Sequence, residues 1–504
     1  MPAPIPDKPP VVIQGGMGVG VSSLQLASAV ARTGQLGVVS GTALDVVLAR
    51  RLQDGDPTGM FRDALAALPL PGLAERVMGR WFIEGGKSPG QPYSPTPRLG
   101  LRGNHHGDEL AVAGNFVEVW LAKRGHDGVV GINFLEKIQM ATPPAAYGAM
   151  LAGVDYVLMG AGIPREIPKL LDELAAARPG SLGVEVAGGQ THRATFDPAS
   201  IPGGADLRLR RPSFLAIVSA HVLATYLCRE DSTRPDGFVV EGPSAGGHNA
   251  PPRGRLVLDD AGEPVYGPRD AADLKAMVKL GLPFWLAGGY GAPERVRQAL
   301  AYGAAGVQVG TLFALSRESG LAPHLRDALL DGLRVDTLRV RTDPYASPTG
   351  FPFKVAQIAD TLSDSDVYEA RPRLCDLGYL RQPFERPGGG IGYRCPAEPI
   401  DVFVRKGGTA EEAEGAKCLC NALVSNVGMG QHRKDGYDEP AIVTLGSDLA
   451  GARRLDAERW LVGRGEPWTA EEAVTWLLRQ VPAESQVRRG QVPAGPADLS
   501  RAGR

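Results

Sequence analysis

The stretch Gly303-Ala304-Ala305-Gly306-Val307-Gln308-Val309-Gly310-Thr311 contains a short run of β-branched residues set between glycines. A helix-like stretch, Pro293 to Tyr302, comes directly before it. Ala304 to Val309 is apolar apart from Gln308, and a mostly apolar run of this kind is typical of a strand covered on both faces, as in a parallel sheet. This part of the chain therefore predicts a helix followed by a buried parallel strand.

The same alternation of a short apolar run and a helix-like stretch occurs eight times along the chain. The runs cover residues 11–13, 36–39, 129–132, 156–159, 214–218, 238–240, 284–287 and 307–309. Eight alternations favour an α/β fold with a closed TIM-type (β/α)₈ barrel over an open doubly wound sheet. A further strand-like run, Leu182 to Val186, is interpreted as part of an insertion.

Four helices have clear start signals. Ser22 to Arg32 begins with N-cap candidates, and Pro164 precedes a helix predicted over Arg165 to Ala177. The other two helices are predicted over Asp273 to Leu280 and Pro293 to Tyr302, with Gly281 and Gly303 near their C-caps.

The domain prediction follows from where this alternation is interrupted. We expect a barrel over residues 1–345 with long insertions at about 54–128 and 188–209, because both stretches exceed ordinary loop length. Residues 346–485 are expected to form an accessory C-terminal segment packed on the barrel. Residues 486–504 are rich in Pro, Gly and Arg and are expected to be a disordered tail.

Composition excludes several classes of protein. The chain has 504 residues, with 54 Lys and Arg against 56 Asp and Glu, so no global field attracts nucleic acid or an anionic membrane. The sequence shows neither a signal-peptide core nor an apolar run long enough to span a bilayer. Five cysteines form no disulfide framework, and the odd count fits a reducing compartment. We therefore expect a cytoplasmic protein that acts on a small-molecule substrate. Neither nucleic acid nor a membrane is expected as a partner.

Glycines at three predicted strand ends point to a phosphorylated flat ligand. Gln14-Gly15-Gly16-Met17-Gly18 follows the first strand, Ala287-Gly288-Gly289-Tyr290 ends the seventh and Gln308-Val309-Gly310-Thr311 ends the eighth. In barrels, the loops after the last two strands commonly hold a phosphate with backbone N–H groups, which glycine leaves uncovered. The Thr311 hydroxyl can add a donor.

The sixth predicted strand leads into Glu241-Gly242-Pro243-Ser244-Ala245-Gly246-Gly247-His248. A neutral imidazole can take a proton near neutral pH, because its ordinary pKa is about 6.5. His248 is therefore the candidate catalytic residue.

Together and in this order, Gln14 to Gly18, Gly131-Ile132-Asn133, Gly246 to His248, Ala287 to Gly289 and Gly303 to Thr311 resemble the nitronate monooxygenases, once called 2-nitropropane dioxygenases. The FMN-dependent enoyl-acyl-carrier-protein reductases share the same barrel and motifs. The resemblance implies FMN at the mouth of the barrel, with His248 binding a nitronate or removing the proton next to a nitro group. The implied cofactor residues, taken with the loop after the first strand, are Gly15, Gly16, Met17, Asn133, Glu241, Gly246, Gly288, Gly289, Gln308, Val309, Gly310 and Thr311.

The sequence departs from the family pattern beside the predicted flavin. Glu241 stands where many relatives have Gln, and a carboxylate there would disfavour an anionic flavin by repulsion. Three hypotheses stay open: oxidation of alkyl nitronates by O2 to carbonyl compounds and nitrite, reduction of an enoyl thioester by NAD(P)H, and a noncatalytic flavin-binding regulator. The intact His248 argues against the third.

The C-terminal segment holds Cys375, Cys395, Cys418 and Cys420. Four thiols could make a zinc or iron–sulfur site, although the only close pair has C-x-C spacing. Buried structural thiols are the alternative, and no metal ligand is assigned.

Overall fold

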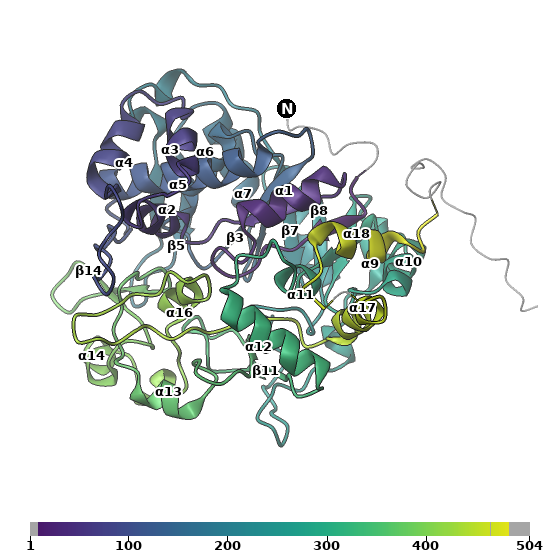
Figure 1. Cartoon of the computed structure of the whole chain (residues 1–504). Helices are drawn as coiled ribbons and strands as arrows, with labels where there is room; N and C mark the ends of the chain where they lie inside the picture. The colour runs from purple at the N-terminus through teal and green to yellow at the C-terminus, as the bar shows by residue number, and fades with distance from the viewer. Residues whose placement is uncertain (1–8, 464, 483–504) are drawn as a thin grey trace, which may run out of the picture.

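The structure, a computed structural model, describes residues 9–463 and 465–482. Eight parallel strands form its centre (Figure 1): β1 (Val12–Gln14), β2 (Gly37–Ser40), β3 (Val130–Leu135), β4 (Tyr156–Gly160), β7 (Ser213–Val218), β8 (Gly237–Glu241), β9 (Phe284–Ala287) and β10 (Gly306–Val309). β10 pairs with β1, and the Gln14 backbone N–H donates to the Leu36 carbonyl at 2.9 Å, which brings β1 to the start of β2. The sheet therefore closes, and the predicted (β/α)₈ barrel with its eight strands is confirmed.

Alternate residues of these strands fill two different layers. One set points into the barrel and forms a core of its own that includes Ile13, Leu158, Leu215 and Trp285. The Trp285 indole N–H donates to the Pro10 carbonyl at 2.7 Å, so the chain entering β1 is fixed to the barrel core. The other set packs against the surrounding helices, which is why the strands read as mostly apolar runs, interrupted at a few positions such as Asn133 and Gln308.

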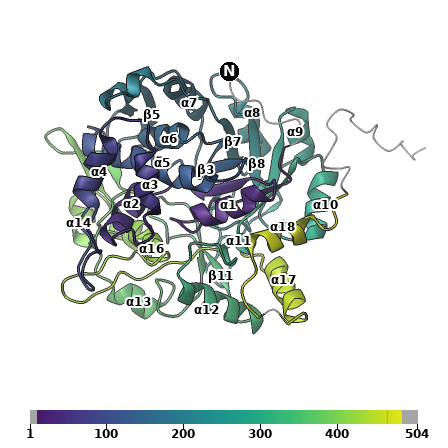
Figure 2. The ribbon, with the colours of Figure 1, turned by 45° about the horizontal axis from the view of Figure 1, so that its top comes forward.

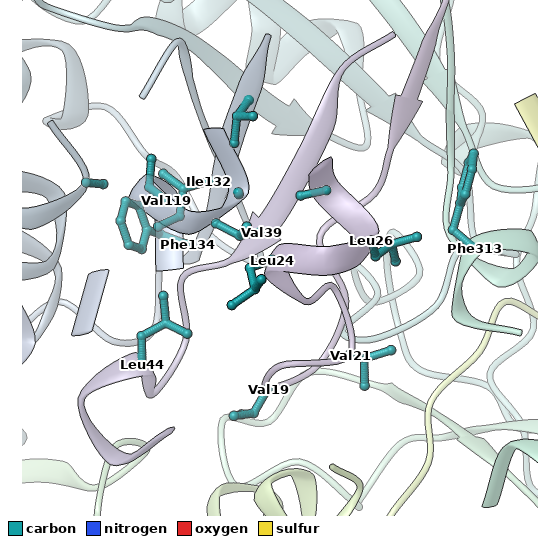
Figure 3. Close-up of a cluster of buried hydrophobic side chains, with 14 of the residues drawn as sticks. Val19, Val21, Leu24, Leu26, Val39, Leu44, Val119, Ile132, Phe134 and Phe313 are labelled. Carbon is teal, nitrogen blue, oxygen red and sulfur yellow. The ribbon is translucent and has the colours of Figure 1, made fainter. Parts of the chain in front are cut away.

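Figure 3 shows part of this outer layer, where Leu24 lies beside Val39 and Leu26 lies toward Phe313. The helices that follow or flank the barrel strands are α1 (Leu24–Arg32), α2 (Leu44–Gln53), α6 (Thr142–Leu151), α7 (Ile167–Ala175), α8 (His221–Leu227), α9 (Leu274–Lys279), α10 (Pro293–Ala301) and α11 (Thr311–Ala314).

The predicted helix starts agree with the structure except in one case. Ser23 caps α1, and the Asp273 side chain accepts from the Lys275 and Ala276 amides at the start of α9. The prediction that Pro164 opens a helix at Arg165 is wrong, because α7 begins at Ile167 and has Pro168 in its first turn. Proline is favoured in the first turn of a helix, and Pro164 and Pro168 both fit this preference. The sequence alone therefore did not distinguish them.

The first predicted insertion contains a helical layer. It comprises α3 (Met60–Ala66), α4 (Leu73–Trp81) and the 19-residue helix α5 (His105–Lys123). Most residues of α5 are buried between α2 and α6. A Cβ on Gly148 of α6 would overlap the Val112 carbonyl oxygen of α5, so glycine is required for this close approach.

The strand-like run near Leu182 lies outside the barrel. β5 (Gly180–Val184) pairs antiparallel with β6 (His192–Phe196), and the short 3₁₀ helices η1 (Pro198–Ser200) and η2 (Gly204–Asp206) follow. A third 3₁₀ helix, η3 (Pro268–Asp270), lies in the loop after β8.

The chain after the last barrel strand contains short elements: α12 (Pro323–Arg334), β11 (Val340–Asp343), β12 (Phe353–Ala356), α13 (Ser365–Ala370), β13 (Gln382–Glu385), β14 (Ile391–Arg394), α14 (Ile400–Arg405), α15 (Ala410–Ala413), α16 (Leu419–Ser425), α17 (Ala450–Trp460) and α18 (Ala470–Leu478). α18 packs against α1 and α10, and α17 packs against α12, as both views show (Figures 1 and 2). The division into domains stays a prediction, and the expected tail at 486–504 lies outside the described residues. In the described part of the chain, we find no helix with the length and apolar character needed to cross a membrane.

Candidate active site

The carboxyl ends of β1, β8, β9 and β10 surround a cavity. Its volume is about 1200 Å³ when the space at its open entrance is counted. All of the predicted cofactor residues except Asn133 line this cavity. Asn133 lies on β3 and contacts the loop after β1, where a Cβ on Gly16 would overlap the Asn133 Cβ. It therefore supports the cavity wall and is absent from its lining.

The loop after β9 depends on glycine. Gly288 and Gly289 have φ values of +82° and +79°, which side chains rarely adopt. A Cβ on Gly288 would lie 3.0 Å from the Gly242 carbonyl oxygen in the loop after β8. A side chain at Gly288 would therefore be strained by the positive φ and would require the loop after β8 to shift.

Gln308 gives the clearest sign that a polar ligand belongs in the cavity. Its Oε1 atom is buried and has no hydrogen-bond partner among the described residues, although the side chain belongs to the cavity lining. A buried acceptor left without a donor costs about 1–3 kcal/mol. A flavin carries an N–H group that could supply this donor, so the residues present fit FMN.

The C-terminal segment supplies one wall of the cavity, through Thr444, Leu445, Gly446, Asp448 and residues 450–452. The Gly247 amide donates to the Thr444 hydroxyl at 2.8 Å, and the Gly446 amide donates to the Thr311 hydroxyl at 3.0 Å. Sequence reasoning missed these residues. No motif marks them, and their partners lie 197 and 135 residues away along the chain.

A second cavity, of about 910 Å³, lies beside the first and contains His248, Tyr266 and Phe351 in its lining. The His248 Nε2 atom lies 2.7 Å from the Ser347 hydroxyl, and its ring meets the Phe353 ring edge-on at 4.9 Å. Burial, with a smaller contribution from Lys137, lowers the pKa of His248 to about 4. The imidazole is therefore neutral at pH 7 and available as a hydrogen-bonding group. Its low pKa makes it a weaker base than the ordinary value of about 6.5 used in the sequence prediction.

Glu241 ends β8 and lines both cavities. Burial raises the pKa of this carboxyl to about 8. The expectation that a carboxylate at this position repels an anionic flavin therefore fails at neutral pH, because the group is protonated there.

The four C-terminal cysteines, which come from separate parts of the segment, line one small cavity. Burial raises the pKa of Cys418 to about 12, and it also raises the pKa values of the other three thiols. Among residues 9–463 and 465–482, no group of three or more His, Cys, Asp or Glu side chains is placed to hold a metal ion. Cys418 lies at the N-cap position of α16 without a side-chain capping hydrogen bond, and Cys420 lies in the first turn of that helix.

Comparisons with solved structures gave only weak overall similarity. FabK from Thermotoga maritima has a TM-score of 0.45 and 15% identity, covering 94% of this chain and 92% of the other. A nitroalkane oxidase from Streptomyces ansochromogenes has a TM-score of 0.41 and 16% identity, covering 95% and 97%. The barrel assignment rests on the strand pairing described above.

Two curated relatives share 33% identity over a short stretch. Both are called (3aS,4S,5R,7aS)-5-hydroxy-7a-methyl-1-oxo-octahydro-1H-indene-4-carboxyl-CoA dehydrogenase. The one from Rhodococcus jostii matches over 109 residues, which is 21% of this chain and 27% of the relative. The one from Mycobacterium tuberculosis matches over 106 residues, 20% of this chain and 26% of the relative. The alignments thus span about a quarter of each relative's length.

A family model described as nitronate monooxygenase matches residues 211–344. The matched segment begins just before β7 and contains the loops after β8, β9 and β10, which hold His248, Gly288, Gly289 and Gly310. These are the loops that form most of the two cavities. Over residues 211–344, which include β7 to β10 and the loops after β8, β9 and β10, the chain is therefore similar to the nitronate monooxygenases.

Proposed function

We propose that the protein is an FMN-dependent oxidoreductase that oxidises alkyl nitronates with O2 to carbonyl compounds and nitrite. The observation that carries the proposal is the convergence of residues from Gly15 to Thr311 on one cavity that adjoins His248. The family match over this segment supports the same reaction class.

The residues divide between the two cavities by role. Gln308 offers an unpaired acceptor to the flavin, and the glycines after β9 and β10 leave backbone amides uncovered for its phosphate. Bound FMN would supply electron transfer between substrate and O2. His248, fixed by Ser347 and Phe353, orients the substrate in the second cavity and takes a proton when the neutral nitro compound is offered.

The second candidate function is reduction of an enoyl thioester by NAD(P)H. The protonated Glu241 favours it, because a carbanion formed during such a reduction needs an acid close to the flavin.

Purified protein, reconstituted with FMN if it is isolated without it, should show a flavin spectrum that is released on denaturation. Anaerobic mixing then separates the two functions: bleaching by a nitronate and not by NADPH supports the monooxygenase, whereas bleaching by NADPH supports the reductase. Protein that stays colourless after reconstitution would contradict both functions. A Gly288→Val variant is the matched control for binding at this cavity, because a branched side chain cannot be placed there without strain.

A further inference from the structure

Glu241 occupies a position that no other described residue shares. It is the one member common to the linings of the proposed flavin cavity and the cavity of His248. It ends β8, where its backbone pairs in register with Ala287 of β9. Its carboxyl therefore lies at the boundary where flavin and substrate would meet.

The Glu241 carboxyl is not used to hold the protein together. Among the described residues it has no hydrogen bond or ion pair, so both of its oxygens are available to a ligand. Ala287 is its partner on β9, and Ile217, Val218 and Ser219 of the neighbouring β7 chain line the second cavity with it.

The charged and titratable groups around the two cavities do not offset this burial. In the first cavity they are Tyr290, Glu294, Arg295 and Asp448. In the second they are His248, Arg253, Tyr266 and Asp270. Several are engaged elsewhere: Glu294 pairs with Arg454 at 3.0 Å, Arg295 donates to Gln298, and Asp270 accepts from the Arg253 backbone. Burial is the only cause that acts on Glu241, and no cation stabilises its charge.

We infer that Glu241 binds the substrate as a neutral carboxylic acid, donating its O–H to a negatively charged oxygen of the substrate. The inference rests on the proposed function and assigns it a class of substrate, delocalised oxyanions such as nitronates. A carboxylate at this position would repel such an oxygen, whereas a protonated carboxyl in an apolar site donates a strong hydrogen bond to it. His248 is neutral as well, so the oxyanion meets no negative charge from these two residues.

The kinetic test compares wild type with Glu241→Gln, whose amide keeps a neutral donor at every pH. At pH 7 the two enzymes should differ by less than about tenfold in kcat/KM. Above pH 8 the wild-type value divided by the Glu241→Gln value should fall about tenfold per pH unit, because only wild type loses its donor. Any change in the substrate's own protonation affects both enzymes equally, so it cancels when the wild-type kcat/KM is divided by that of Glu241→Gln. Glu241→Ala, which has no donor, should be slow at both pH values. A ratio that stays constant from pH 7 to pH 10 would overturn the inference.

A second readout needs neither cofactor nor turnover. The infrared difference spectrum of wild-type apoprotein minus Glu241→Gln apoprotein should show the carbonyl band of a protonated carboxyl at pH 6. The band should disappear as the pH rises through about 8. Absence of the band at pH 6 would overturn the inference. Presence of the band in a protein that cannot be loaded with FMN would support the protonated carboxyl and reject only the proposed function.

Discussion

Glu118→Gln is expected to remove a pH dependence from the stability of the protein. Glu118 lies on α5, is 6% exposed, and accepts a hydrogen bond from the Leu24 amide at 2.9 Å at the start of α1. Burial raises the pKa of this carboxyl to about 7, although the Leu24 amide and Arg51 act in the opposite direction. Gln has the same shape and can still accept from Leu24, but it carries no charge.

The direction and size of the effect follow from proton linkage. The folded protein keeps the Glu118 proton up to about pH 7, whereas the unfolded chain releases it near the ordinary value of 4.5. The stabilisation is fully present below pH 4.5 and is lost as the pH rises through 7. Between pH 5.5 and pH 8.5 this one group should lower the free energy of unfolding by about 2 kcal/mol.

The assay is equilibrium urea unfolding of wild type and Glu118→Gln at both pH values. The variant minus wild-type difference should become about 2 kcal/mol more favourable to the variant at pH 8.5, because all other titrating groups cancel in the comparison. A difference that is the same at both pH values would show that Glu118 titrates normally and that the burial argument is wrong.

Three further predictions concern the site and the packing around it. His248→Ala should keep the flavin spectrum and lower kcat by ~10²–10⁴-fold, and steady-state rates equal to wild type would contradict its assigned role. Gly288→Val should weaken FMN binding by roughly tenfold or more in a fluorescence titration, since φ is +82° there, while unchanged affinity would show that the loop after β9 does not hold the cofactor. Gly148→Ala should destabilise the protein by about 1–3 kcal/mol in urea unfolding, because its Cβ overlaps the Val112 carbonyl; a smaller effect would mean that α5 and α6 can separate at little cost.

The barrel could be predicted because its strands are short, buried on both faces and separated by helices, so that runs such as Val307-Gln308-Val309 are readable locally. The cavity lining from β1, β8, β9 and β10 could be predicted for the same reason, since carboxyl ends of barrel strands meet at one face. The contribution of Thr444 and Gly446 to the cavity wall could not be predicted. Their hydrogen bonds to the loops after β8 and β10 depend on how the C-terminal segment folds back, which no local pattern encodes.

Protonation states were also beyond the sequence. Glu241 reads as an ordinary carboxylate and His248 as an ordinary imidazole until their surroundings are known. Burial raises the pKa of Glu241 to about 8 and lowers the pKa of His248 to about 4, so the carboxyl has the higher pKa of the two. The sequence identified both residues, and only the structure shows that the acid of the pair is the glutamate.

The wall contributed by residues 444–452 has a consequence for biosynthesis. A ribosome that has translated every barrel strand, through Val309, has still to synthesise the residues that close one side of the first cavity. In a nascent chain at that stage the cavity lacks one wall, so it cannot enclose a ligand until synthesis is nearly finished. Proteins shortened before residue 444 would lack this wall, and a ligand in the cavity would be open to solvent on that side.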